Sequence, residues 1–248
     1  ILVGGIALWA VLGNASFTVA SGAVFNFLTV KFAWLYLLAM LAFVVFVFAI
    51  AFSRYGNIKL GPDDSKPEYS TASWFAMLFG AGMGVGLVFW GISEPISHYV
   101  SPIAGIKEMS PESAAFAIKA SFMHWGIHPW ANYAIIGLAL AYFQFRKNRP
   151  GLISTIFEPL IGEKGIKGPV GKLIDILAVF ATVAGVTTSL GLGTMQINSG
   201  LNYMFKIPSS LQVQIIIVII ISIIYIWSAV AGIEKGIKLI SDANLYIA

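Results

Sequence analysis

The sequence predicts an all-α protein embedded in a membrane, and two observations support this fold class. Of the 248 residues, 58% are hydrophobic and 10% are charged, and the mean hydropathy is +0.85, whereas soluble domains carry about 25% charged residues. Several uncharged stretches also reach the roughly 20 residues that a helix needs to cross a bilayer. The absence of cysteine excludes disulfides and thiolate metal sites. A net charge of +4 without a basic stripe argues against nucleic acid as a partner.

One transmembrane domain with six spans and the start of a seventh is expected over residues 1–248. The first segment is an apolar run, and the second lies uncharged between Lys31 and Arg54. The next three contain long cores without Lys, Arg, Asp or Glu, at 70–93, 120–145 and 176–205. The sixth is rich in isoleucine, and the seventh stops after a few residues, so we expect a fragment of a longer protein. The predicted segments are 1–12, 32–53, 72–98, 113–145, 173–204, 211–230 and 243–248.

Basic side chains are distributed unevenly between the predicted connections. Eleven of the 15 lysines and arginines follow the second, fourth and sixth segments, and four lie on the opposite side. The more positive side of a membrane protein normally stays in the cytoplasm. We therefore expect a multi-pass protein of the cell inner (plasma) membrane with its N-terminal side in the cytoplasm.

The middle of the third segment is unusually rich in glycine, in the run GAGMGVG. Each glycine weakens a helix by about 1 kcal/mol relative to alanine, and unwound backbone at this depth is tolerated where it faces protein or a cavity. Carbonyls freed in this way are ligands for a hard cation such as sodium. Close packing between helices is the alternative explanation. The predicted hinge residues of this segment are Gly82, Gly84 and Gly86.

The fourth segment contains a dense aromatic run, HWGIHPWANY. Pro129 removes a backbone donor and is expected to kink the helix. Four aromatic residues fall on one arc of an ideal helix, namely Phe122, Trp125, Trp130 and Tyr133. Electron-rich ring faces attract quaternary ammonium groups, which have no hydrogen-bond donors. The arc therefore indicates a site for such a cation, with ordinary aromatic packing as the alternative.

The fifth segment carries hydroxyl side chains near the same bilayer depth. Thr182 and Ser189 share one face with Val186, and Thr187 and Thr188 lie beside them. Hydroxyls in a membrane usually bond to backbone carbonyls or to a neighbouring helix. Their clustering near the depth of the glycine-rich run makes a cation site the competing interpretation.

A metal site is the rival interpretation of the fourth segment. His124 and His128 have an i, i+4 spacing that suits zinc, but the HExxH motif needs glutamate at the position of Trp125. No carboxylate lies on the same helical stretch, and Glu94 is the nearest candidate elsewhere. The expected roles of Glu94 are an ion pair with a basic side chain, a place along an ion path, or a solvated loop carboxylate. We therefore expect histidines that bond to neighbouring helices, with no metal, no cofactor and no enzyme activity.

The motifs together resemble the betaine/choline/carnitine transporter family. The resemblance is carried by GAGMGVGLVFWGISEP and FMHWGIHPWANYAIIGLALAY, and the pattern continues in PLIGEKG, GKLIDILAVFATV, SLGLGTMQI and SAVAGIEKGI, over nearly the whole chain. It implies a leucine-transporter-like inverted-repeat fold with two extra N-terminal spans. The chain then holds those two spans and most of the first repeat, and the second repeat is absent.

The resemblance also implies site residues. The family's aromatic box for a trimethylammonium group matches Trp125, Trp130 and Tyr133, and we add Phe122 and Met83 to the expected substrate site.

For sodium, the family's first cation site matches the backbone carbonyls of Gly80 and Met83, and its second site matches Thr182. Val186 stands where the sodium-coupled pattern carries threonine. This departure is expected to remove a ligand unless a neighbouring hydroxyl compensates, so Thr188 and Ser189 join the expected sodium ligands.

The implied function is secondary active transport of a quaternary ammonium solute, with glycine betaine expected first and choline or carnitine next. The run GMGVG has no aspartate, whereas a carboxylate near the ammonium group would favour choline. Sodium-coupled symport is expected, and the alternatives are sodium-independent or proton-coupled transport of the same solutes. An intramembrane metalloenzyme using His124 and His128 is the alternative from another class. The resemblance further suggests a homotrimer in the lipid bilayer.

Overall fold

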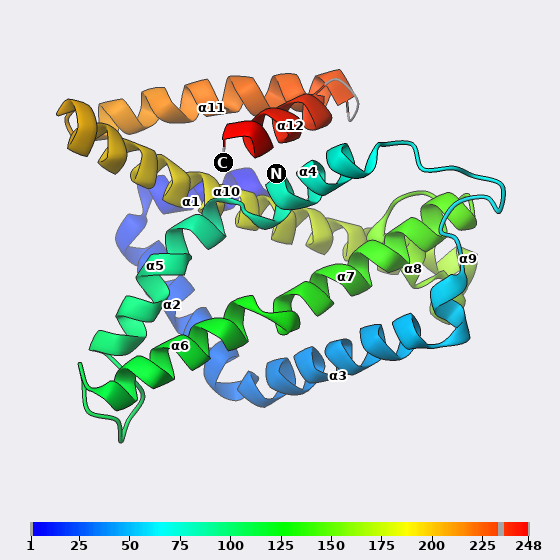
Figure 1. The fold of residues 1–248 in the computed structure, drawn as a ribbon, viewed down its shortest axis with the longest axis horizontal. Coiled ribbons are helices and arrows are strands. Elements are labelled where there is room, and N and C mark those ends of the chain that lie inside the picture. The colour runs from blue at the N-terminus through cyan, green and yellow to red at the C-terminus, as the bar shows by residue number, and fades with distance from the viewer. Residues whose placement is uncertain (1, 233–235, 248) are drawn as a thin grey trace. The chain divides into compact units, whose positions relative to one another are not determined.

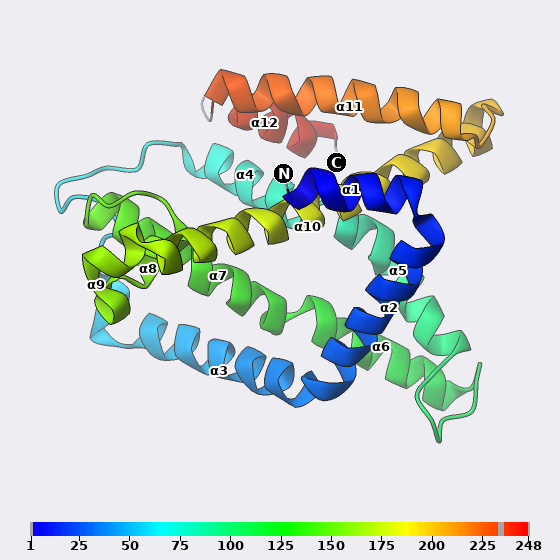
Figure 2. The ribbon, with the colours of Figure 1, turned by 180° about the vertical axis from the view of Figure 1, so that it is seen from behind.

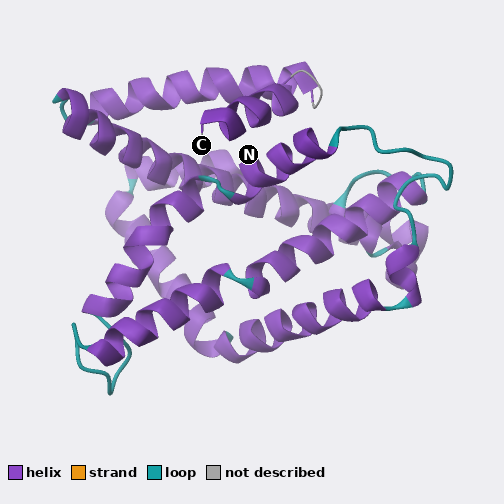
Figure 3. Ribbon diagram, in the orientation of Figure 1, coloured by secondary structure: helices purple, strands orange, loops and turns teal. Residues whose placement is uncertain are grey.

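The computed structural model describes residues 2–232 and 236–247, which form helices, turns and loops, with no strand among them (Figure 3). The chain divides into two compact units, each built from two separate stretches. The first unit comprises Ile1–Asp64 and Met123–Val183, and the second comprises Ser65–Phe122 and Ala184–Ala248.

The first unit begins with α1 (Leu2–Leu12) and α2 (Asn14–Lys31), which meet at Gly13 with a bend of 120° (Figure 2). The predicted spans leave residues 13–31 unassigned, where serine, threonine and asparagine interrupt the apolar pattern. In the structure the hydroxyls of Thr18 and Thr29 donate to carbonyls one turn earlier, at 2.8 and 2.9 Å. The helix thus satisfies its own hydroxyl groups and tolerates them in its interior.

The long helix α3 (Ala33–Phe52) packs beside α7 (Ile127–Ala141) in the same unit (Figure 1). A 3-10 turn, η1 (Arg54–Asn57), follows α3, and α7 continues into a π-helical turn, η2 (Tyr142–Arg146). Helix α3 has no buried residue although its side chains are almost all apolar, which is the surface expected of a helix that faces lipid.

The end of α7 is tied to the connection after α3. Arg146 donates to the Asp63 carboxylate at 2.6 Å and to the Gly61 carbonyl at 3.0 Å, and this hydrogen bond and charge lower the pKa of the Asp63 carboxyl. Two short helices then lead towards α10, namely α8 (Ile153–Ile156) and α9 (Glu158–Lys167).

The remaining helices form the second unit or enter it. They are α4 (Thr71–Gly82), α5 (Val85–Val100), α6 (Pro111–Trp125), α10 (Pro169–Phe205), α11 (Leu211–Gly232) and α12 (Lys238–Ile247).

Small side chains let α12 pack closely on α4, where Ala76 is 1% exposed and Ser241 is buried. A Cβ atom added at Gly80 would lie 3.5 Å from Ser241 Oγ, so α12 contacts α4 within one turn of the end of that helix.

The apolar helices are those of a multi-pass membrane protein. Among the described residues, α3, α10 and α11 are each long and apolar enough to cross a membrane, and the number rises to five if the bent pairs α1–α2 and α4–α5 each form one span. The predicted segment 113–145 falls into α6, α7 and η2, and the described part of the predicted 243–248 falls into α12, which begins at Lys238. The terminal residues Ile1 and Ala248 lie outside the described residues. The predicted number of spans stays a prediction.

Candidate functional site

The helix of the fourth predicted segment is interrupted three residues before its proline. Helix α6 ends at Trp125, Gly126 has the non-helical angles φ −83° and ψ −136°, and α7 begins at Ile127. In a continuous helix the Trp125 carbonyl would accept from residue 129, but Pro129 has no N–H and its ring would clash with that carbonyl. The effect of Pro129 is therefore seen at Gly126, and the proline itself lies in the first turn of α7, where no backbone donor is needed.

The Trp130 indole takes the place of the missing backbone donor. Its Nε1 donates to the Trp125 carbonyl at 3.1 Å, so the side chain bridges the helix break. Its ring meets Tyr133 edge to face, with centroids 6.0 Å apart and planes at 71°. Both rings remain accessible, at 41% and 62% exposure, and together they form an accessible corner of two ring faces directly after the break.

The other expected substrate residues are placed separately. The half-buried Trp125 ring lies beside His124, with centroids 5.0 Å apart. Phe122 and Met83 are exposed and belong to the second unit. The contacts of the first unit thus bring together Trp130 and Tyr133 and link them to the backbone of Trp125.

The glycine-rich run also coincides with a helix break. Helix α4 ends at Gly82, Met83 (φ −89°, ψ 41°) and Gly84 (φ −72°, ψ 176°) are not helical, and the pair α4–α5 is bent by 47°. The Met83 amide donates to Phe79 O at 2.7 Å, so the carbonyls from Gly80 onward have no partner within α4. The backbone angles at Gly84 can be adopted by any residue. We therefore attribute the effect of the glycines on this segment to their low helix propensity.

The hydroxyls of the fifth predicted segment bond within their own helix. Thr182 Oγ1 donates to Ala178 O at 2.8 Å, and Thr188 Oγ1 donates to Ala184 O at 3.0 Å. Helix α10 runs unbroken past both, with Thr182 in the first unit and Thr188 and the exposed Ser189 in the second. Each donating hydroxyl keeps its oxygen lone pairs, so this bonding is compatible with cation coordination as well as with the purely structural interpretation.

Two buried polar residues of α10 were not singled out from the sequence. Thr194 and Asn198 are 3% and 1% exposed, and Thr194 Oγ1 and Asn198 Oδ1 have no hydrogen-bond partner among the described residues. Asn198 also donates to Pro208 O at 3.1 Å, which holds the connection to α11. Their i, i+4 spacing in an apolar helix was the signal available beforehand.

A metal centre gains no support from the histidines. Among the described residues, no three His, Cys, Asp or Glu side chains lie together in a group suited to a metal. Glu94 lies within α5, is 7% exposed, and has Oε1 3.5 Å from His98 Nε2, so it is a buried helix residue and not a solvated loop carboxylate.

The histidines permit a direct test of the metalloenzyme alternative in the full-length protein. Chelators are expected to leave solute uptake unchanged, because transport needs no bound transition metal in the site described above. We expect His124→Asn to reduce uptake less than Trp125→Ala, with both measured at matched expression. Stoichiometric zinc in the purified protein, lost with activity in His128→Ala, would contradict this expectation.

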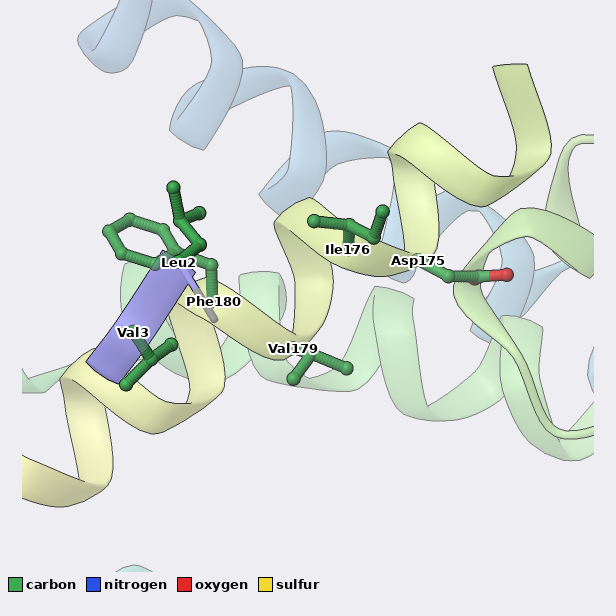
Figure 4. Close-up of a pocket in the computed structure, with 6 residues that line it drawn as sticks. All are labelled: Leu2, Val3, Asp175, Ile176, Val179 and Phe180. Atoms are coloured by element: carbon green, nitrogen blue, oxygen red, sulfur yellow. The ribbon is translucent and has the colours of Figure 1, made fainter. Parts of the chain in front are cut away.

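One pocket of the first unit is lined by neither member of the aromatic pair. It has a volume of about 440 Å³ and lies between α1 and α10 in the first unit, and the residues that line it are Leu2, Val3, Asp175, Ile176, Val179 and Phe180 (Figure 4). Asp175 is the polar member, and its carboxylate points away from Leu2 and Val3 (Figure 4) and accepts two hydrogen bonds from Ser154. Among its described lining residues the pocket is therefore apolar apart from Asp175, whose carboxylate is bonded to Ser154.

Comparison with known proteins connects these features to transport. The model of the betaine/carnitine/choline family of transporters matches residues 1–248. The chain is 50% identical to the glycine betaine transporter OpuD of Bacillus subtilis (strain 168), over 97% of this chain and 47% of that protein. It is 48% identical to an ectoine/hydroxyectoine transporter of Virgibacillus pantothenticus, over 89% and 44%. It is 40% identical to the high-affinity choline transport protein of Escherichia coli (strain K12), over 92% and 33%. The chain spans about half the length, or less, of these curated relatives.

Proposed function

The chain belongs to the betaine/carnitine/choline transporter family, and on that premise we propose that the full-length protein is a secondary active transporter of quaternary ammonium solutes. The observation that carries the proposal is the corner formed by Trp130 and Tyr133 directly after the break at Gly126. Two ring faces at a large angle suit a tetrahedral trimethylammonium group better than a parallel stack does, because each face meets a different pair of methyl groups.

Glycine betaine is the first proposed substrate, followed by choline or carnitine. The names of similar proteins include glycine betaine and choline, and the glycine-rich break carries no carboxylate to favour the purely cationic choline. Uptake of radiolabelled betaine, choline and carnitine by the full-length protein tests this order. Ectoine belongs in the same series because a relative at 48% identity is named for it.

Sodium-coupled symport is the proposed mechanism. It is supported by the carbonyls from Gly80 onward, which have no partner within α4, and by the hydroxyl oxygens of α10. The alternatives are sodium-independent or proton-coupled transport of the same solutes. Uptake that is identical in sodium and potassium would remove sodium coupling and leave these alternatives.

The two threonines of α10 allow the number of sodium sites to be tested. Thr182→Ala is expected to raise the half-saturating sodium concentration about ten-fold, because a lost oxygen ligand weakens cation binding. If Thr188 compensates for the hydroxyl missing at Val186, Thr188→Ala will raise the half-saturating sodium concentration by a similar factor. If Thr188→Ala has no effect, we expect this protein to have one sodium site fewer than the sodium-coupled pattern of the family. The sodium dependence of uptake should then have a Hill coefficient of about 1. Sodium titrations of uptake at saturating solute measure both quantities.

The membrane arrangement is part of the proposal. A protein of the inner (plasma) membrane with a cytoplasmic N-terminal side agrees with the uneven distribution of lysine and arginine. The inverted-repeat fold and a homotrimeric assembly are proposed from the family resemblance. Labelling of single cysteines in the connections 54–70 and 101–110 from each side of the membrane would test the orientation.

A further inference from the structure

The connection between α7 and α10 is folded and anchored, although it lies outside the predicted spans. The backbone amide and hydroxyl of Ser154 donate to the two oxygens of Asp175 at 2.9 and 2.8 Å. Ser154 and Thr155 are each 2% exposed, and Arg149 forms an ion pair with Glu158. The Ser154–Asp175 contacts hold α8 against the start of α10 (Figure 2), and the Arg149–Glu158 ion pair ties the start of α9 to the loop that precedes α8.

Apolar side chains nevertheless project from this anchored segment. Leu160 in α9 is 80% exposed, and its neighbours Phe157 and Ile161 are also exposed. Helix α10, which is long and apolar enough to cross a membrane, begins at Pro169, two residues after α9 ends. The exposed apolar side chains thus lie close in sequence to a membrane boundary, where acyl chains can cover them.

Two lysines that form no ion pair in the described part of the chain accompany the apolar side chains, and Lys147 Nζ lies 5.6 Å from the centroid of the Tyr142 ring. Helix α9 is kinked at Gly162, whose φ of +72° is a left-handed conformation that favours glycine, and Lys164 follows this kink. Lys147 lines a hollow of about 500 Å³ together with residues of α9, including Gly162 and Glu163. Within the described part of the chain, the ion pairs of this connection involve Arg146, Arg149 and Lys167, whereas exposed Lys147 and Lys164 pair with no carboxylate.

We propose that α9 together with Lys147 is a binding surface for anionic phospholipid. Leu160 and Ile161 enter the acyl-chain boundary, and the ammonium groups of Lys147 and Lys164 contact the headgroup phosphates. A bilayer lipid is the occupant that matches both parts of the surface, because it presents an apolar chain and an anionic phosphate side by side. The connection carries five of the 15 basic residues, so it faces the leaflet side that the charge distribution assigns to the cytoplasm.

Fluorescence quenching in vesicles tests this surface without any measurement of transport. The full-length protein, in a background without other cysteines, carries Leu160→Cys labelled with an environment-sensitive fluorophore. It is reconstituted with brominated phosphatidylglycerol or brominated phosphatidylcholine at equal mole fraction. We expect stronger quenching by the anionic lipid, since each lysine near the surface enriches anionic lipid about five-fold. Ile161→Cys serves as a second reporter position, and Asp64→Cys, in the connection after α3, is expected to show little quenching by either lipid.

Charge variants identify the residues responsible. Lys147→Gln with Lys164→Gln is expected to make quenching by the two lipids equal, whereas Lys66→Gln, which removes one charge from another connection on the same predicted side, should leave the preference intact. Equal quenching in the unmutated background would overturn headgroup recognition. Absence of quenching at both 160 and 161 would show that protein covers the surface and would overturn the proposal. Because neither readout depends on uptake, failure of the proposed transport function would be seen separately.

Discussion

Trp130→Ala is expected to lower quaternary ammonium uptake about 30-fold at limiting solute concentration. A cation–π contact in a desolvated pocket contributes about 2 kcal/mol, which corresponds to that factor in affinity. The structure adds a second role, because the indole Nε1 also bonds the Trp125 carbonyl at the helix break. Uptake measured over a range of solute concentrations, at matched expression, gives the change in apparent affinity.

Two further variants separate these roles. Trp130→Phe keeps an aromatic face and loses the hydrogen bond, and we expect it to retain part of the activity if the ring face binds the solute. Trp227→Ala is the matched control, because Trp227 in α11 is exposed to a similar degree, 50% against 41%. Equal losses at Trp130 and Trp227 would indicate packing and would remove the evidence for a cation site on α7.

Gly84→Leu is expected to raise the half-saturating sodium concentration at least about five-fold or to abolish uptake. Leucine favours a helix over glycine by about 1 kcal/mol, and the angles at Gly84 are accessible to any residue. The substitution therefore leaves the broken conformation allowed but stabilises a continuous helix, in which the carbonyls of Gly80 and Met83 would be occupied by backbone bonds. We expect Gly82→Leu to act in the same direction.

Gly91→Leu is the control for helix propensity and bulk. Gly91 lies in α5 beyond the break, and a Cβ atom there would meet no atom within 4 Å apart from its chain neighbours and the nearby backbone of its own helix. Its substitution adds the same side chain within α5 without affecting the break, so sodium dependence should be retained. If Gly84→Leu and Gly91→Leu shift the sodium dependence equally, the break at Met83 and Gly84 has no part in cation binding.

The candidate site was predicted in its residue types more fully than in its geometry. The helical arc of Phe122, Trp125, Trp130 and Tyr133 assumed a continuous helix with about 100° per residue. That assumption holds separately on each side of Gly126, so the Trp130–Tyr133 contact follows from spacing within α7, whereas the angles that relate them to Phe122 do not apply across the break. The positions of Phe122 and Met83 relative to the first unit stay predictions, as do all the proposed ion ligands.

The sequence by itself determined the membrane character, the helix break at the glycine-rich run and the family. Each of these depends on composition or on neighbouring residues, since apolar length selects a spanning helix and clustered glycines weaken one locally. The tertiary structure decided which polar groups are satisfied, and this depends on partners distant in the chain or on helix ends. The burial of Ser154 against Asp175 joins residues 21 positions apart, and the packing of α12 on α4 brings Ser241 to Gly80. No local pattern specifies such contacts, because they form only when separate helices pack and exclude solvent from the groups between them.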